Sequence, residues 1–314
     1  MTLTELLAAH ACRPTHGVPD WMLGYYKRRA ISFANGHTDL QTHVCWLQSR
    51  SFTIDLRLPL EDRQVVARNL ADYSAAELQV LANYEGWEAL SDWREPMLSW
   101  HSDTSLQLHN RWPEPAELKR FGNCMIEFAP SGAYVEDWRL QPSAPGPLIG
   151  LRLLEEREVG SGVVRHRGGG LIVCGDYAAL VLGRAEPLVV PADTQLRERV
   201  AAAVGDAAQL ARLFNFETSV AQGSLAKGYT VSLSTQPARV GQRLLALDGF
   251  EYLAAEEQVR QTVEVDGIVC QRLFTIDTLE ASLPYAQATG FTPAAAAWFE
   301  RESLTLTRYT QPLC

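Results

Sequence analysis

Hydrophobic and polar positions alternate with a period of two through much of this chain, most clearly between residues 43 and 59. Two alternating runs, 43–48 and 52–58, flank the polar residues Ser49, Arg50 and Ser51. Successive side chains of a strand point to opposite faces, so this pattern predicts a β-hairpin. The second run divides into two sets, apolar Phe52, Ile54, Leu56 and Leu58 on one face and Thr53, Asp55 and Arg57 on the other.

Similar pairs of runs recur along the chain, separated by turn residues such as Gly, Pro and Asp. The predicted strand pairs are 124–128 with 134–140, 171–174 with 178–183, 216–221 with 229–235, and 258–265 with 268–276. Helical patterns are confined to short stretches, 2–11, 61–71, 75–84, 193–204, 206–214 and 293–303, before a closing strand at 304–309. The sequence therefore predicts a mainly β protein with antiparallel strands and a few short helices.

A chain of 314 residues is long enough for two domains. Residues 141–150, QPSAPGPLIG, are rich in Pro and Gly, which marks a boundary between domains at 21–150 and 151–314. Each half follows a hairpin with a helical segment and then with a hairpin that ends in Gln-Pro, at Gln141-Pro142 and Gln236-Pro237. This order indicates an internal duplication, and the alternative is chance similarity, because β proteins share turn chemistry.

Composition excludes several classes of function. The formal net charge of −9 argues against a nucleic-acid partner, because binding to phosphates needs a basic face. No run approaches the ~20 apolar residues that cross a bilayer, and the N-terminus lacks a basic leader, so we expect no membrane association and no secretory signal. The six scattered cysteines form no CxxC pair. A reduced, cytoplasmic protein is the expectation.

The strand pattern ISFANG…TDLQTHVCWLQSRSFTIDLRLP, within residues 29–59, and the hairpin at 132–139 resemble a poorly characterised family of paired barrels. Its members are built as two adjacent lipocalin-like (calycin) β-barrels, and fungal members are known mainly as partners of a casein-kinase-like enzyme. The resemblance implies two adjacent antiparallel lipocalin-like halves, an N-terminal β-barrel domain and a C-terminal barrel-like domain, with an internal cavity. It implies no reaction and no set of site residues.

Signatures of cofactor and metal chemistry are absent from the sequence. There is no GxGxxG after a strand, no Walker loop, no HExxH and no GxSxG. The glycines at 168–170 precede a strand and predict a flexible turn, and the histidines show no metal-ligand spacing. Ser224 and Lys227 fit S-x-x-K, but they lie in a predicted hairpin loop where a solvated turn is the better interpretation. We expect neither a cofactor nor a metal.

Asp55 and Arg57 lie two residues apart on one face of the second strand of the first hairpin. If that face points into a barrel, Arg57 can anchor an anionic group of a ligand. If it points outward, the two form a weak surface ion pair, which is the general expectation for polar residues of a sheet. Period two alone cannot choose between these faces.

His101 and Asp103 repeat this ambiguity on another predicted strand, with Trp100 expected to face the opposite way into packing. In a cavity, Asp103 could orient His101 as a general base, and Glu136 could supply a second acid–base group. The remaining candidates for a cavity lining are acidic or aromatic: Glu127, Trp46, Trp100 and Trp138.

The function that we expect is binding of a small, partly apolar, anionic ligand in a barrel cavity of the N-terminal half. The alternatives are an isomerase, lyase or hydrolase that uses His and carboxylate acid–base chemistry in that cavity, and a scaffold that binds a protein partner. The sequence decides neither catalysis nor the oligomeric state, because barrels of this kind host many functions.

Overall fold

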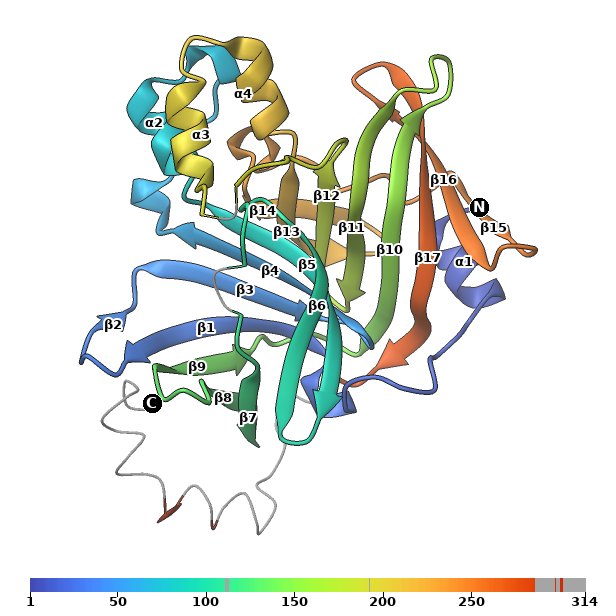
Figure 1. The fold of residues 1–314 in the computed structure, drawn as a ribbon. Coiled ribbons are helices and arrows are strands. Elements are labelled where there is room, and N and C mark those ends of the chain that lie inside the picture. Colours follow the sequence, from blue (N-terminus) through green and yellow to red (C-terminus); the bar gives the residue numbers. More distant parts are fainter. Residues whose placement is uncertain (111–112, 192, 286–296, 298–299, 302–314) are drawn as a thin grey trace.

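The structure is a computed structural model. It describes residues 1–314 except 111–112, 192, 286–296, 298–299 and 302–314, and its two sheets lie side by side with the helices at the periphery (Figure 1). Of the described residues, 49% lie in strands and 15% in helices, so the protein is mainly β, which confirms the predicted class. Among the described residues, no helix is long and apolar enough to cross a membrane.

The first sheet closes into an antiparallel barrel of eight strands, because β1 pairs with β9 as well as with β3. The closing register runs from Tyr26 opposite Leu140 to Phe33 opposite Tyr134. The barrel strands are β1 (Gly24–Phe33), β3 (Thr42–Gln48), β4 (Phe52–Pro59), β5 (Glu85–Arg94), β6 (Met97–Ser105), β7 (Ala116–Phe121), β8 (Cys124–Phe128) and β9 (Tyr134–Leu140), and the short β2 (Thr38–Asp39) extends β1. The predicted hairpin of residues 43–59 is confirmed as β3 and β4.

The second sheet has eight antiparallel strands in the order β14-β13-β12-β11-β10-β17-β16-β15. No pairing between the described residues joins its two end strands, β14 and β15. Its strands are β10 (Gly146–Glu158), β11 (Val164–Cys174), β12 (Tyr177–Arg184), β13 (Glu217–Ser224), β14 (Gly228–Ser234), β15 (Phe250–Leu253), β16 (Gln258–Val265) and β17 (Ile268–Leu283). Closure of this half into a second barrel, its lipocalin-like identity and an internal duplication all stay predictions.

The helices are short. They are α1 (Leu3–Ala9), α2 (Ala75–Leu81), α3 (Leu196–Ala202) and α4 (Ala207–Leu213), with 3-10 turns η1 (Asp20–Met22), η2 (Glu61–Arg63), η3 (Leu70–Asp72) and η4 (Pro237–Arg239). The Ser74–Glu77 capping box predicted for α2 is present. The helix predicted for 61–71 is wrong, because only the turns η2 and η3 form there. The helix predicted for 293–303 and the strand predicted for 304–309 lie almost entirely outside the described residues.

The outer face of the barrel packs against the second sheet. In β4, Ile54 and Leu56 point away from the barrel axis and share one apolar core with Ile172 of β11 and Val181 of β12. Strands β3, β4 and β5 contact β11, β12 and β13 across this interface. Both faces of β4 are therefore buried, one inside the barrel and one between the two sheets.

Glycines make this close approach possible. The glycines at 168–170 lie within the continuous strand β11, so the predicted flexible turn is wrong. A Cβ atom on Gly168 would lie 2.6 Å from Oγ1 of Thr104 in the barrel, and one on Gly86 of β5 would lie 2.5 Å from Oγ1 of Thr218 in β13. Because real Cβ atoms do not come this close to a neighbour, glycine sets the distance between the two sheets.

Buried ion pairs also join the two sheets. Arg152 Nε donates to Oε1 of Glu88 at 2.6 Å, and Arg50 Nε donates to Oε1 of Glu280 at 2.7 Å. Burial raises the pKa of Glu88 to about 7, against the opposing effect of Arg152. The two halves share a core and polar contacts, and their division at residue 150 into domains stays a prediction.

Candidate functional site

An internal cavity of about 50 Å³ lies inside the first barrel. Its walls come from the inward-facing residues of β3, β4, β5, β6, β8 and β9 and from the segment after β6. The acidic and aromatic residues that line it are Asp55, Glu85, Asp103, Glu127, Glu136, Trp46, Trp87, Trp100, Trp138 and Tyr134. The rest of the lining consists of Arg57, Thr53, Ala89, Ser105, Gln107, His109 and Asn110. The cavity is small by the standard of pockets for drug-sized ligands, which are about 300–1,000 Å³.

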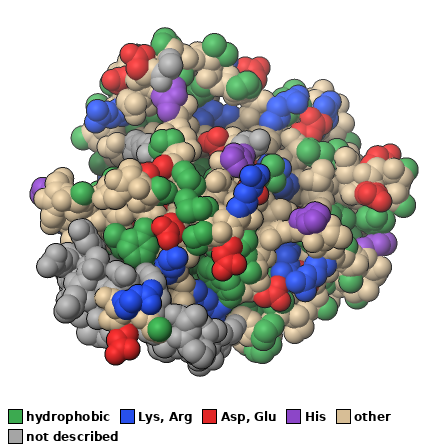
Figure 2. Space-filling view, turned by 60° about the horizontal axis from the view of Figure 1, so that its bottom comes forward, with side chains coloured by type: hydrophobic (Ala, Val, Ile, Leu, Met, Phe, Trp, Pro, Cys, Tyr) green, Lys and Arg blue, Asp and Glu red, His purple; other side chains and the backbone are tan. Residues whose placement is uncertain are grey.

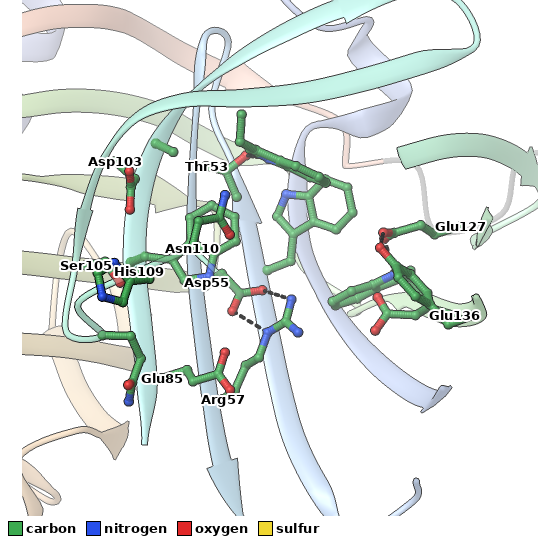
Figure 3. Close-up of a pocket in the computed structure, with 17 residues that line it drawn as sticks. Thr53, Asp55, Arg57, Glu85, Asp103, Ser105, His109, Asn110, Glu127 and Glu136 are labelled. Atoms are coloured by element: carbon green, nitrogen blue, oxygen red, sulfur yellow. Dashed lines mark hydrogen bonds and ion pairs between the residues drawn. The ribbon is translucent and has the colours of Figure 1, made fainter. Parts of the chain in front are cut away.

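Arg57 and Asp55 point into this cavity, which settles the question that the sequence left open. Arg57 Nε donates to Oδ1 of Asp55 at 2.9 Å, and only 10% and 3% of the two side chains are exposed. The pair lies between the Glu127–Glu136 side of the cavity and the Asp103–Ser105–His109 side (Figure 3). The apolar set of β4 can face outward because the second sheet covers it.

The charges around Arg57 keep it ionised. Burial alone would lower the pKa of Arg57, but the carboxylates of Asp55, Glu136 and Glu85 outweigh burial and raise it. Burial raises the pKa of Asp55, and Arg57 offsets only part of that rise. The guanidinium is therefore a fixed charge already engaged with Asp55.

Glu127 and Glu136 form a second buried group. They lie directly opposite each other on β8 and β9, and they are 4% and 2% exposed. Burial, and then the charge of Glu136, raises the pKa of Glu127 well above its ordinary value. Trp138 Nε1 donates to Oε2 of Glu127 at 2.9 Å, while Arg28 NH1 donates to Oε1 of Glu136 at 2.7 Å. Glu127 is thus held as a neutral acid beside an ion-paired Glu136.

Four tryptophans form a continuous aromatic wall. The ring centroids of Trp46 lie 5.2 Å from those of Trp138 and 5.9 Å from those of Trp100, both edge to face. Trp87 contacts Trp100 in the same way at 5.9 Å. These spacings are favourable for aromatic pairs and fix the rings in place.

A buried hydrogen-bond network closes one end of the cavity. Oγ1 of Thr53 donates to Oε1 of Gln48 at 2.5 Å, and Nε1 of Trp100 donates to Oγ1 of Thr53 at 3.2 Å. Nε1 of Trp46 donates to the same Oε1 of Gln48 at 3.0 Å. Gln48 therefore holds two of the four indoles from one end of the barrel.

The segment after β6 lies over the other end. Nε2 of Gln107 donates to the backbone oxygens of Ala82 at 2.9 Å and Tyr84 at 2.7 Å, which anchors this segment beside α2. Nε2 of His109 is buried there and forms no hydrogen bond to any residue in the described part of the chain.

A surface groove of about 520 Å³ adjoins this end and shares Arg57 and Glu85 with the cavity. Figure 2 shows apolar side chains among charges of both signs on the molecular surface.

The structure does not bring His101 and Asp103 together. Both residues are exposed; Asp103 lines the cavity and His101 does not. Trp100, which was expected to face the opposite way from Asp103, lines the cavity together with it. The cause is a β-bulge: Glu88 and Leu90 are two residues apart on β5, but their partners Thr104 and His101 are three apart on β6. The extra residue reverses the alternation, so a His101–Asp103 dyad does not form.

Of the other predicted site residues, Arg57, Asp55, Glu127, Glu136, Trp46 and Trp138 all line the cavity. The cavity residues of β5 were not predicted from the sequence, because apolar and polar residues do not alternate clearly along this strand. Gly86 and Glu88 on its outer face are covered by the second sheet, so neither face is distinctly apolar. Tyr134 was not predicted either, although Tyr134, Glu136 and Trp138 share the period of two. His109 follows the same alternation as Gln107 but was not among the predicted site residues.

The second half buries an apolar core and, beside it, polar side chains such as Glu156 and Arg272, which form an ion pair at 2.6 Å. On one face of its sheet, Leu3 and Leu6 of α1 share an apolar core with Ile149, Leu151 and Leu171. The charges and aromatic rings of the first half surround a cavity, whereas the buried Glu156 and Arg272 of the second half pair with each other.

The described cysteines and the Ser224–Lys227 motif do not line the cavity. The described cysteines are free, and burial raises the pKa of the Cys45 and Cys124 thiols to about 11. Among the residues that the structure describes, no cluster of His, Cys, Asp and Glu is arranged to hold a metal ion. Ser224 and Lys227 lie at the β13–β14 turn, where the backbone N–H of Lys227 donates to Oγ of Ser224 at 3.3 Å.

The chain matches no known family model. No curated protein matches it in sequence. It is similar in structure to an uncharacterized protein from Saccharomyces cerevisiae, with a TM-score of 0.40 and 12% identity over 80% of this chain and 96% of that chain. Nothing about function follows from a similarity at this level.

Proposed function

We propose that this protein binds a small molecule in the cavity of its N-terminal barrel. The observation that supports the proposal most strongly is the composition of the barrel interior. Burying ionisable groups is costly, and a barrel needs only apolar side chains to be filled. The first half nevertheless places five carboxyl groups, one arginine and four tryptophans around a cavity, counted over the described residues. Binding sites are typically concave, with aromatic walls and a few placed polar groups.

Native mass spectrometry of the freshly purified protein tests this function. We expect a non-covalent adduct of low mass on the wild-type protein that is lost on Trp100→Leu. The matched control is Trp93→Leu, because Trp93 packs edge to face on Trp21 and does not line the cavity. An adduct that both variants retain would place the ligand elsewhere. If the wild-type protein carries no adduct, and no compound in a screen of small molecules binds it, the proposal is overturned.

An enzyme that uses the same cavity is the alternative, and the Glu127–Glu136 pair is the observation that favours it. A carboxyl group kept neutral beside a cavity can donate a proton as a general acid, and its ionised neighbour can accept one. In this alternative Glu127 takes the acid role, while His101 has none because it lies outside the barrel. Glu127→Gln would then abolish turnover of the bound molecule and leave its binding intact. A turnover rate that Glu127→Gln does not change would exclude this role.

A further inference from the structure

We infer that the ligand of this cavity is a compact organic cation, such as a primary or methylated ammonium group, held between carboxylates and indole faces at the Glu85–Asp103 end. The inference rests on the proposed function, because it assigns a ligand class to the same cavity. It replaces the anionic ligand expected from the sequence, which required Arg57 to be available as an anchor.

The charge balance of the lining favours a cation. Among the described lining residues, five carry carboxyl groups and only Arg57 carries a permanent positive charge. That charge is engaged by Asp55, and the charge of Glu136 is engaged by Arg28. Glu85 and Asp103 add two further acids, from β5 and β6, so an anion entering this end would meet carboxylates.

The tryptophans offer ring faces to the cavity. The N–H groups of Trp46, Trp100 and Trp138 already donate to Gln48, Thr53 and Glu127. These indoles can therefore contribute their π-faces to a ligand, while the donors on their edges are occupied. A cation over an indole face is attracted by the ring quadrupole, and this attraction is strongest where water is excluded.

A buried nitrogen of His109 and the size of the cavity each limit the kind of ligand that can bind. Nε2 of His109 is buried and makes no hydrogen bond within the described part of the chain. A neutral imidazole nitrogen can accept a hydrogen bond from an ammonium N–H.

The volume of about 50 Å³ limits the enclosed group to a few non-hydrogen atoms. Ala89 is the only aliphatic side chain among the described lining residues, so an alkyl chain would find few partners.

Calorimetric titration with three compounds of similar size tests the charge of the ligand. The probes are ethylammonium, ethanol and acetate at constant ionic strength. We expect ethylammonium to bind at least about tenfold more tightly than ethanol or acetate, since a desolvated cation–π contact alone supplies a factor of this order. Acetate binding as tightly as ethylammonium, or more tightly, would overturn the inference.

Two variants, each lacking one carboxylate, test whether ethylammonium binds at the cavity. Asp103→Asn, at the cavity, should weaken ethylammonium binding about tenfold. Asp92→Asn, which changes an exposed carboxylate of β5 paired with Arg94, should leave the affinity unchanged. Equal losses in both variants would indicate attraction to the general surface charge and would contradict a cation site in the cavity.

The same titrations separate this inference from the proposed function. If ethanol or acetate binds at least as tightly as ethylammonium, and tryptophan fluorescence recorded in parallel also changes, the cavity binds small molecules but the cation assignment is wrong. If ethylammonium fails to bind, the cation assignment is wrong in any case. The proposed function fails with it only when native mass spectrometry and the compound screen also find no ligand.

Discussion

Glu127 and Glu136 face each other across β8 and β9 inside the barrel, with their side chains almost completely buried. Arg28 compensates the charge of Glu136, whereas Glu127 receives hydrogen bonds from Trp138 and, at 3.4 Å, from the hydroxyl of Tyr134. Two ionised carboxylates at such a position would repel each other strongly, so Glu127 keeps its proton. This arrangement predicts how the stability of the protein depends on pH.

Glu127→Gln should remove part of that dependence. The pKa of Glu127 is raised in the folded state above its ordinary value near 4.5. Above that value the unfolded chain releases a proton that the folded protein retains, so stability falls as the pH rises until Glu127 ionises in the folded state. We expect the free energy of unfolding of the wild type, relative to Glu127→Gln, to fall by up to about 1.4 kcal/mol per pH unit within this range.

Urea unfolding of both proteins between about pH 5 and about pH 8 measures this difference. Glu88, whose pKa is about 7, titrates in the same range. Both proteins contain Glu88, so its contribution cancels in the comparison. A difference that does not change with pH would show that Glu127 ionises normally.

Arg57→Ala should be strongly destabilising. The substitution leaves Asp55, whose side chain is 3% exposed, without its guanidinium partner inside the barrel. Removing one member of a buried ion pair costs about 3–5 kcal/mol. Urea unfolding near neutral pH, followed by circular dichroism, measures the loss.

Arg94→Ala is the matched control for this change. Arg94 pairs with Asp92 at 3.1 Å at the surface, and its side chain is 85% exposed. Its loss should cost about 0–1 kcal/mol. If Arg57→Ala were as mild as this control, Arg57 would not be held in a buried pair.

Gly86→Ala should destabilise the protein at the contact between the barrel and the second sheet. A Cβ atom at this position would lie 2.5 Å from Oγ1 and 2.7 Å from Cβ of Thr218. We expect a loss of about 1–3 kcal/mol in unfolding free energy, as is typical of overpacking, with partial recovery on adding Thr218→Gly. Gly160→Ala meets no atom within 4 Å and should be nearly neutral. Equal stability of the two alanine variants would contradict the close approach of the sheets.

The sequence predicts those elements whose two faces differ in polarity. The β3–β4 hairpin, the capping box at Ser74 and the turn at Asp266-Gly267 follow from local patterns that the structure preserves. Strand β5 was missed because both its faces are buried, and its outer face carries Gly86 and Glu88 instead of large apolar residues.

The candidate site was predictable only in part. The period of two grouped Asp55 with Arg57, but the side of the barrel on which they lie depends on the second sheet, which is distant in sequence. On β6 the same rule failed, because one extra residue opposite Ala89 places Trp100 and Asp103 on the side of the cavity and His101 on the other side. A bulge leaves no clear local signature, so sequence periodicity alone could not exclude His101.

The central claim is that a small molecule binds inside the first barrel, and the indole N–H signals of the tryptophans report on it directly. We propose ¹⁵N-edited NMR titrations with any ligand found by native mass spectrometry or by the compound screen, using Trp→Phe variants to assign the signals. The account predicts shifts in the signals of the cavity tryptophans Trp46, Trp87, Trp100 and Trp138, with those of Trp21 and Trp93 unchanged. Ligands that shift only Trp21 and Trp93, or that bind without moving any of the four cavity signals, would contradict it.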